Sequence, residues 1–351
     1  MVSIVSGLLV GFVGGFALQR GGFCMHSAFR SIVFEKDHSI LRAWILILAI
    51  NVPILLLLEQ AGVIFPARAP FTPIAGLVGG LVFGVGMVLA GGCVSGTWYR
   101  ASKGMTGSLV ALLGFAAGGL MMTRGVFAPA RALATDLELS IAGEEASLYN
   151  LPSALGDGFF PGFGLRWIVA LIVVVPLVVY LLRAPKSRFT IGWPWYLTGA
   201  VLAVVALSAW FFSSLEYRDY GLSIVAPTNA IASLLLLGDD TGINWASWFL
   251  IGLVPGAVAA AWKSGDLSFR VPSAARLVQN LGGGLLMGLG ANLAGGCNIG
   301  HGVTGISVLS IGSIWATATT IAGVWIATWI LYRIARRGGE RHQQVAGSAS
   351  V

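Results

Sequence analysis

The sequence predicts an all-α membrane protein that crosses the bilayer about nine times and consists of two halves with opposite orientation. Three observations support this prediction. Hydrophobic residues make up 56% of the 351 residues and charged residues only 10%, which is too little charge to cover a soluble protein of this size. Nine apolar runs are long enough to cross a bilayer, and a glycine-rich motif that contains a cysteine occurs twice.

The apolar runs are the candidate membrane spans, because a bilayer core of about 30 Å takes about 20 helical residues. They fall near 3–19, 41–62, 73–90, 106–123, 166–182, 193–213, 244–262, 277–294 and 311–334. The first run has no positively charged segment before it and no small-x-small cleavage site after it, so we expect a true span rather than a signal peptide. The 49 glycines and 12 tryptophans suit close helix packing and membrane interfaces.

The distribution of lysine and arginine predicts the orientation of the chain. With the C-terminus inside, the inner gaps hold sixteen of the 21 basic residues and the outer gaps five. This is a clear positive-inside bias, so we expect the N-terminus outside, the 124–165 loop outside and a basic tail, 335–351, in the cytoplasm. The net charge of +7 is spread over many short gaps, which argues against nucleic-acid binding.

An internal repeat predicts how the spans are arranged. Residues 79–108 and 282–307 both run apolar with frequent glycine, reach Ala-Gly-Gly-Cys at Cys93 and Cys297, and end in Thr-Gly before the next segment. The first copy follows an inward span and the second an outward span, which is the pattern of an inverted repeat. A single transmembrane domain, 1–334, would then contain a first half (1–123), the outer loop (124–165), a linking span (166–192) and a second half (193–334).

Four short apolar segments lie between the spans and are too brief to cross a bilayer. They cover 24–34, 94–102, 226–237 and 298–309, and each follows a break of small or polar residues. We interpret them as re-entrant half-helices, which are tolerated at membrane depth when they are buried in protein or line a cavity. The N-terminus of a half-helix carries a partial positive charge, so the path that these segments line is suited to an anion.

The three cysteines, Cys24, Cys93 and Cys297, each follow Gly-Phe or Gly-Gly at a span end. They form no Cys-x-x-Cys pair and have no histidine at metal-ligand spacing, so we expect no metal and no cofactor. A disulfide within one pair remains open, and cysteine can also serve as a small apolar residue in membrane helices. Their shared position after a helix break favours a functional role.

The segments GGFCM (21–25), GGCVSGTWYRASKG (91–104) and GGCNIGHGVTGIS (295–307) resemble the three cysteine signatures of the YeeE/YedE family of sulfur-transport membrane proteins. The resemblance covers the whole chain, and nine spans in two inverted halves are also that family's architecture. It implies thiosulfate uptake through a bacterial inner membrane, with Cys24, Cys93 and Cys297 along a central path. It also implies a small cytoplasmic sulfur-carrier protein as a partner, while some branches of the family are associated with other sulfur or selenium species.

Thiosulfate has a soft sulfur end and a hard sulfonate end, and the residues around the cysteines suit both. Neutral thiols donate weak S–H hydrogen bonds to the terminal sulfur. The sulfonate can bind the backbone amides at the half-helix N-termini, beside Gly92 and Gly296, and hydroxyl and imidazole groups nearby. These candidate groups belong to Ser95, Thr97, His301 and Thr304.

Two functions from other classes compete with transport. A membrane thiol-redox or sulfur-transfer enzyme would need an activated cysteine and a second cysteine within bonding reach, and no such pair is visible in the sequence. A structural subunit would not explain a repeat with cysteine at its centre. No G-x-x-x-x-G-K loop occurs, which argues against ATP-driven transport by this chain alone.

Overall fold

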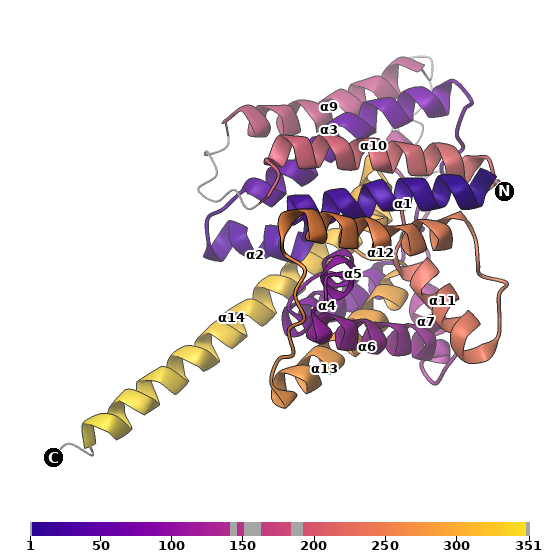
Figure 1. Cartoon of the computed structure of the whole chain (residues 1–351). Helices are drawn as coiled ribbons and strands as arrows, with labels where there is room; N and C mark the ends of the chain where they lie inside the picture. The colour runs from indigo at the N-terminus through magenta and orange to yellow at the C-terminus, as the bar shows by residue number, and fades with distance from the viewer. Residues whose placement is uncertain (1, 141–145, 151–162, 184–191, 349–351) are drawn as a thin grey trace.

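The computed structural model describes residues 2–140, 146–150, 163–183 and 192–348, and within these ranges it is helical and contains no strand (Figure 1). Every predicted span corresponds to a long helix, which confirms the all-α prediction. These helices are α1 (Val2–Gly21), α3 (Ser39–Gln60), α4 (Pro73–Ala90), α6 (Thr106–Thr123), α9 (Phe163–Arg183), α10 (Trp195–Ser214), α12 (Trp245–Ser264), α13 (Ala274–Ala294) and α14 (Ile311–Ser348).

Within the described residues, eight segments are long and apolar enough to cross a membrane, which is typical of a multi-pass membrane protein. The helix α13 has the length but is not among the eight. Its amide side chains, Gln279, Asn280 and Asn292, lower its hydropathy. Nine spans therefore remain a prediction.

Short helices occupy the four segments predicted as half-helices. They are α2 (Met25–Phe34), α5 (Val94–Ser102), α11 (Val225–Leu237) and η2 (Gly300–Gly305). The last is a π-helix rather than an α-helix. Side chains bind two of its carbonyls, because Tyr220 Oη donates to Gly300 O at 3.0 Å and Trp44 Nε1 donates to Gly302 O at 2.7 Å. These bonds and the three glycines of η2 explain why regular α-helix does not form there.

Two regions differ in detail from the prediction. The 124–165 loop contains a helix, α7 (Ala128–Thr135), and a 3-10 turn, η1 (Leu148–Asn150), while residues 141–145 and 151–162 lie outside the described residues. The last predicted span continues as helix through most of the predicted tail, because α14 runs to Ser348. In Figure 1 this helix projects from the body of the protein.

The long helices pack with their backbones in contact at glycines. The pair α1 and α12 is an example: a Cβ atom added at Gly11 would lie 2.1 Å from the Phe249 carbonyl oxygen, and one at Gly15 would lie 2.0 Å from the Leu253 carbonyl oxygen. The partner helix does the same, because a Cβ at Gly256 would lie 2.0 Å from the Phe12 carbonyl oxygen. Such small-residue contacts are how membrane helices associate without a hydrophobic driving force.

The packing follows a paired pattern. Helix α1 packs on α12 as α10 packs on α3, and α4 packs on α14 as α13 packs on α6. Helix α1 also contacts α10, and α4 contacts α13. The short helices show a similar pairing of neighbours, because α2 contacts α3, α4 and α14 while α11 contacts α12, α13 and α6.

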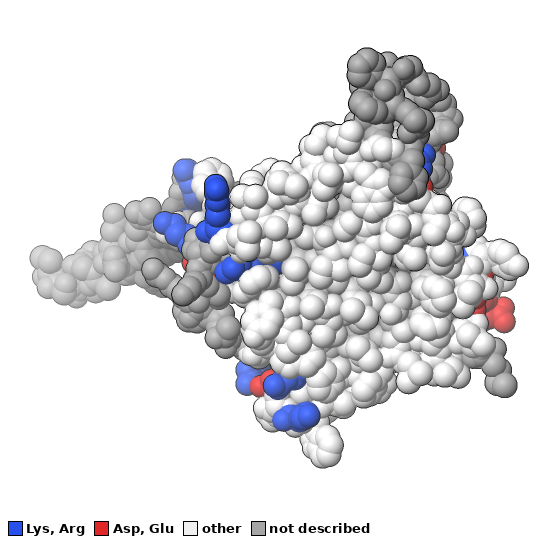
Figure 2. Space-filling view, turned by 90° about the horizontal axis from the view of Figure 1, so that it is seen from above, with Lys and Arg blue, Asp and Glu red and all other residues white. Residues whose placement is uncertain are grey.

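The two ends of the helix bundle differ in which short helices lie there and in their charge. In Figure 1, α2 lies at the end from which α14 projects, whereas α7 and α11 lie at the opposite end, near the N-terminus. Figure 2 shows lysine and arginine mostly around the end from which α14 projects, with a broad uncharged surface between the ends. An uncharged belt of this kind is what a bilayer core requires.

Candidate functional site

The break between α4 and α5 follows directly from the sequence Gly-Gly-Cys. Helix α4 ends at Gly91, whose φ of 78° lies in the left-handed region that favours glycine. Cys93 is the N-cap of α5, and its thiol accepts a hydrogen bond from the Gly96 amide at 3.4 Å. The motif therefore ends one helix and starts the next with a cysteine at the new N-terminus.

A second break brings Cys24 to the same place. Gly22, with φ of 57°, ends the turn after α1, and Cys24 is the N-cap of α2. The Cys24 and Cys93 sulfur atoms lie 3.5 Å apart, and the Cys93 amide donates to Cys24 Sγ at 3.4 Å. Both thiols are free and buried. The structure thus joins two cysteines that are 69 positions apart in the sequence.

Arg100 completes this group of atoms, although the sequence pattern indicated no role for it beyond a positive charge on the inner side. Its Nη2 donates to Cys24 Sγ at 3.2 Å, and its Nη1 donates to the Gly91 carbonyl at 2.7 Å. We refer to Cys24, Cys93 and Arg100 as the paired-thiol site. A sequence signal was present, because Arg100 follows Cys93 by seven positions, two helical turns along the same face.

The predicted hydroxyl ligands beside Cys93 have different surroundings. Ser95 Oγ lies 3.3 Å from Cys93 Sγ, so it faces the paired-thiol site. Thr97 Oγ1 donates to the Cys93 carbonyl at 2.8 Å, which is a helix-internal bond. Gly92 lies beside the arginine, because a Cβ there would be 2.6 Å from Arg100 Nη1.

Cys297 lies at the corresponding break after α13, which ends at Gly295 with φ of 85°. The amides of Ile299, Gly300 and Ile224 interact with its thiol. Among the described residues, Cys297 has no hydrogen bond to either of the other cysteines. The neighbouring Asn298 Nδ2 donates to Met87 Sδ on α4 at 3.0 Å, which connects this break to the first half of the chain.

His301 and Thr304 were predicted as anion ligands, and both bond to protein atoms. His301 Nδ1 lies 3.0 Å from Ser313 Oγ, and its Nε2 lies 3.0 Å from the Ala294 carbonyl at the end of α13. Thr304 Oγ1 donates to the Leu222 carbonyl at 2.7 Å. These contacts hold the break between α13 and η2 in place. Gly296 makes room for the imidazole, because a Cβ there would lie 2.9 Å from His301 Nε2.

Two cavities reach these breaks. One, of about 420 Å³, is lined by polar and small residues around the C-terminus of α13 and the first turn of α11, including Arg131, Ser223, Asn292 and Gly295. The other, of about 270 Å³, is lined by Gly22, Phe23, Ser27 and Trp193 beside the start of α2. Because α11 and α2 lie at opposite ends of the bundle (Figure 1), the cavities approach the breaks from opposite ends.

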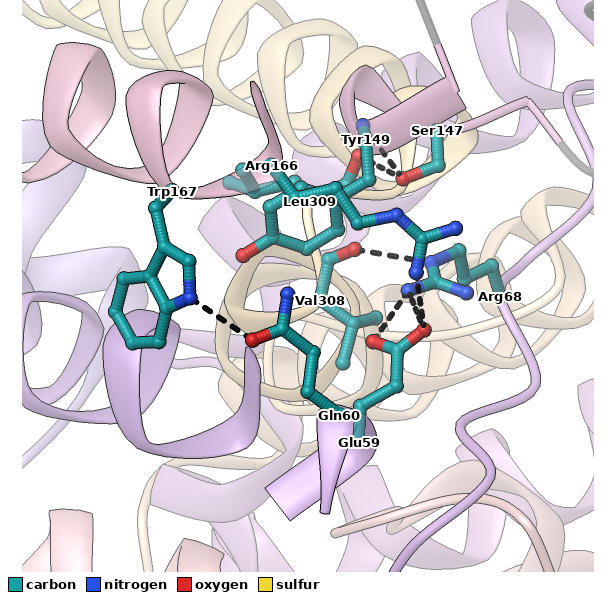
Figure 3. Close-up of polar contacts among 9 residues, drawn as sticks. All are labelled: Glu59, Gln60, Arg68, Ser147, Tyr149, Arg166, Trp167, Val308 and Leu309. Carbon is teal, nitrogen blue, oxygen red and sulfur yellow. Dashed lines mark hydrogen bonds and ion pairs between the residues drawn. The ribbon is translucent and has the colours of Figure 1, made fainter. Parts of the chain in front are cut away.

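A polar cluster fixes the chain beyond η2 (Figure 3). Arg68 binds both Glu59 oxygens at 2.8 and 2.7 Å and donates to the Val308 carbonyl at 3.3 Å. Arg166 lies 3.6 Å from Glu59, and Ser147 donates to the Leu309 carbonyl at 3.2 Å. Glu59, which the sequence places near the outer end of a span, thus belongs to a cluster that anchors the return from η2 to α14.

We expect Arg68→Leu to destabilise the protein by about 3 kcal/mol, because it leaves the largely buried Glu59 carboxylate without its main partner. The double variant Glu59→Leu/Arg68→Leu should recover most of this loss, because it removes both charges. Thermal unfolding in detergent measures the difference. Equal unfolding temperatures for the single and double variants would show that the ion pair does not hold this cluster.

No group of three or more His, Cys, Asp or Glu side chains in the described part of the chain could hold a metal ion. The groups that meet at the paired-thiol site are thiols, a hydroxyl, backbone amides and a guanidinium, all of which can donate hydrogen bonds. Such a set of donors suits an anion, and the sulfur atoms suit an anion with a soft end.

Comparison with known proteins gives a family and several relatives. The family model described as sulphur transport matches residues 20–326. A thiosulfate transporter, TsuA, of Spirochaeta thermophila is 34% identical over 333 residues, which cover 94% of this chain and 99% of the relative. TsuA of Escherichia coli is 30% identical over 346 residues, which cover 94% and 95%. A probable transporter, YedE, of Salmonella typhimurium is 36% identical over 77 residues, which cover 22% and 19%.

Proposed function

Because the chain belongs to the sulphur transport family, we propose that it carries thiosulfate across a bacterial inner membrane into the cytoplasm. The observation that carries this proposal is the pair of buried, free thiols of Cys24 and Cys93, 3.5 Å apart at the N-termini of two half-helices. Cys297, at the third break, is the further thiol on the path.

The donors at the breaks replace the water that the anion loses. An unpaired dianion in an apolar medium would cost on the order of tens of kcal/mol. The amides at the N-termini of α5 and η2 and the Ser95 hydroxyl bind the sulfonate oxygens, while the thiols donate to the terminal sulfur. Several weak sites in series let the ion move on, whereas a single tight site would retain it.

The paired helix contacts support the inverted repeat. If α1, α3, α4 and α6 correspond to α10, α12, α13 and α14, then the main contacts between the halves have counterparts: α1 with α12 matches α10 with α3, and α4 with α14 matches α13 with α6. The short helices match as well, because α5 contacts α6 and α12 while η2 contacts α14 and α3. Such a fold places broken helices from opposite faces around one central path.

A thiol enzyme is the alternative that the short Cys24–Cys93 distance would favour. The relatives that span the chain are named as transporters, and the protein is not an enzyme by that comparison. We therefore assign the pair to hydrogen bonding rather than to disulfide or persulfide chemistry. The cavity beside α2 lies at the end of the bundle from which α14 projects (Figure 1), and we propose that this end is cytoplasmic and available to a small sulfur-carrier protein.

Purified protein in liposomes tests the function. Uptake of ³⁵S-labelled thiosulfate should exceed that of empty liposomes and be inhibited by unlabelled thiosulfate, with sulfate, sulfite and selenium oxyanions as competitors. Uptake of sulfite or a selenium species with no uptake of thiosulfate would assign the chain to another branch of the family.

The orientation makes a separate prediction. A cysteine introduced by Leu133→Cys, on the exposed surface of α7, should react with a membrane-impermeant maleimide in intact spheroplasts. A cysteine introduced by Ser348→Cys should react only after permeabilisation, because we expect the C-terminus in the cytoplasm. The parent protein, whose cysteines are buried, provides the background. Labelling of Ser348→Cys in intact spheroplasts would show that the orientation of the chain is the reverse of the one we propose.

A further inference from the structure

Arg100 lies in the last turn of the nine-residue helix α5, and its guanidinium reaches back to the start of that helix. There it joins the Gly91 carbonyl, at the broken end of α4, to the Cys24 thiol, at the start of α2. The side chain is partly buried, and its cationic head is directed at the sulfur atoms rather than at the surrounding solvent.

Two glycines leave the space that the guanidinium occupies. A Cβ atom at Gly92 would lie 2.6 Å from Arg100 Nη1, and one at Gly96 would lie 3.1 Å from Arg100 Nη2 and 2.8 Å from Cys24 Sγ. The distances of 2.6 and 2.8 Å are too short for a normal contact, and the distance of 3.1 Å is tighter than most. The glycines on both sides of Cys93 thus allow a cation to approach the thiols, in addition to ending one helix and starting the next.

The charge of Arg100 has no carboxylate partner among the described residues. Four arginines in that part of the chain pair with a carboxylate, namely Arg30 with Glu35, Arg68 and Arg166 with Glu59, and Arg124 with Asp239, whereas others bind neutral groups, as Arg276 binds Gln279. A cation inside a membrane protein needs an anionic partner to offset its desolvation. For Arg100 that partner would be an anion that moves along the path past the thiols.

We propose that Arg100 is a substrate-contacting residue of the paired-thiol site that binds the sulfonate end of thiosulfate while Cys24 and Cys93 donate to its terminal sulfur. This inference rests on the proposed transport of thiosulfate. Nη1 stays on the Gly91 carbonyl, and Nη2 transfers its hydrogen bond from Cys24 Sγ to a sulfonate oxygen. Cys24 Sγ then no longer accepts from the guanidinium, and its S–H, which donates to Cys93 Sγ when the site is empty, turns to the terminal sulfur of the anion.

This arrangement binds the ion without trapping it. In the described residues one guanidinium contacts these thiols, and its Nη1 stays on Gly91 O, so the end-on fork of Nη1 and Nη2 is not free for the two-point contact that makes arginine–anion pairs tight. When the ion leaves, Cys24 Sγ replaces it as the acceptor. Arg100 therefore keeps a hydrogen-bond partner in both the empty and the loaded state, which favours passage over retention.

Kinetics of thiosulfate uptake into liposomes test the proposal with the variants Arg100→Gln and Arg100→Lys. Arg276→Gln is the matched control, because Arg276 approaches Gly91 from α13 but its guanidinium binds Gln279 and no thiol. Removing a charged hydrogen bond to the substrate should raise KM at least about tenfold in Arg100→Gln. Arg100→Lys keeps the charge but cannot reach the Gly91 carbonyl and the ion together, so its KM should rise at least about threefold. Arg276→Gln should stay within about twofold of the parent protein.

A binding readout separates substrate contact from a structural role. Thiosulfate should raise the unfolding temperature of the detergent-solubilised parent and of Arg276→Gln, but not of Arg100→Gln, while the unliganded unfolding temperatures remain similar. A folded Arg100→Gln protein with an unchanged KM and an unchanged thiosulfate-induced shift would overturn the proposal. If Arg100→Gln does not fold, an unchanged KM in Arg100→Lys has the same consequence. A parent protein that transports no thiosulfate would refute the proposed function itself.

Discussion

Cys93→Ala should lower thiosulfate uptake at least about tenfold, whereas Cys93→Ser should keep measurable uptake. The thiol of Cys93 lies against Cys24 Sγ and Ser95 Oγ. Its removal therefore takes away a hydrogen-bond donor at the point where we expect the anion to pass from one thiol to the next. A hydrogen bond to a charged group contributes about 1.5–3 kcal/mol, and at least a tenfold loss in rate follows when nothing replaces it. A hydroxyl still donates, but it is shorter and harder than a thiol.

The serine variant is also the control for folding. Cys93 Sγ accepts the Gly96 amide as the N-cap of α5, and loss of an N-cap alone costs about 1 kcal/mol. Serine keeps the cap, so a comparison of unfolding temperatures separates weaker folding from lost transport. Mass spectrometry during uptake should show no persulfide on any cysteine. A persulfide that forms and decays at the rate of uptake would support sulfur-transfer chemistry instead.

The long helices could be predicted from the sequence because each property that defines them is local. An apolar run of about 20 residues has one solution in a bilayer, a helix whose backbone bonds are satisfied internally. The spans expected near 73–90 and 106–123 coincide with α4 and α6, because their apolar runs end where the helices end. The π-turn of η2 was missed because it depends on Trp44 and Tyr220, which are distant in the sequence.

The candidate site could be predicted only in part, for the same reason. The cysteines stand out because each follows a glycine-marked helix break. Their pairing depends on how α1, α4 and the half-helices pack, which no local pattern encodes, so the sequence showed no cysteine pair where the structure has sulfur atoms 3.5 Å apart. Arg100 was expected only as a positive charge on the inner side, because the sequence does not show that its side chain runs back along α5 to the cysteines. His301 was predicted as a ligand from its spacing, yet both of its nitrogens bind Ser313 and Ala294.

The preference for thiosulfate over sulfate should be lost when Cys24, Cys93 and Cys297 are all replaced by alanine. Sulfate presents four hard oxygens, and its fourth oxygen is smaller and more strongly hydrated than the terminal sulfur of thiosulfate. It therefore costs more to dehydrate and gains less from weak S–H donors. Both ions carry the same charge, so the amides and the basic residues attract them alike. We expect the ratio of thiosulfate to sulfate uptake to fall at least about tenfold in the triple variant.

The control variants for the triple cysteine variant remove a positive charge and leave the three thiols in place. Lys103→Ala removes a basic residue of the same end of the protein that contacts none of the cysteines in the described structure, and Arg100→Gln removes the cation beside Cys24. Each should lower the uptake of thiosulfate and sulfate by the same factor, so the ratio stays close to that of the parent protein. Uptake of both labelled anions by each variant, in liposomes from one preparation, gives this ratio directly. If the ratio survives the loss of all three cysteines and falls with Lys103 or Arg100, selectivity resides in charge, and a path based on thiol donors is the wrong description of this protein.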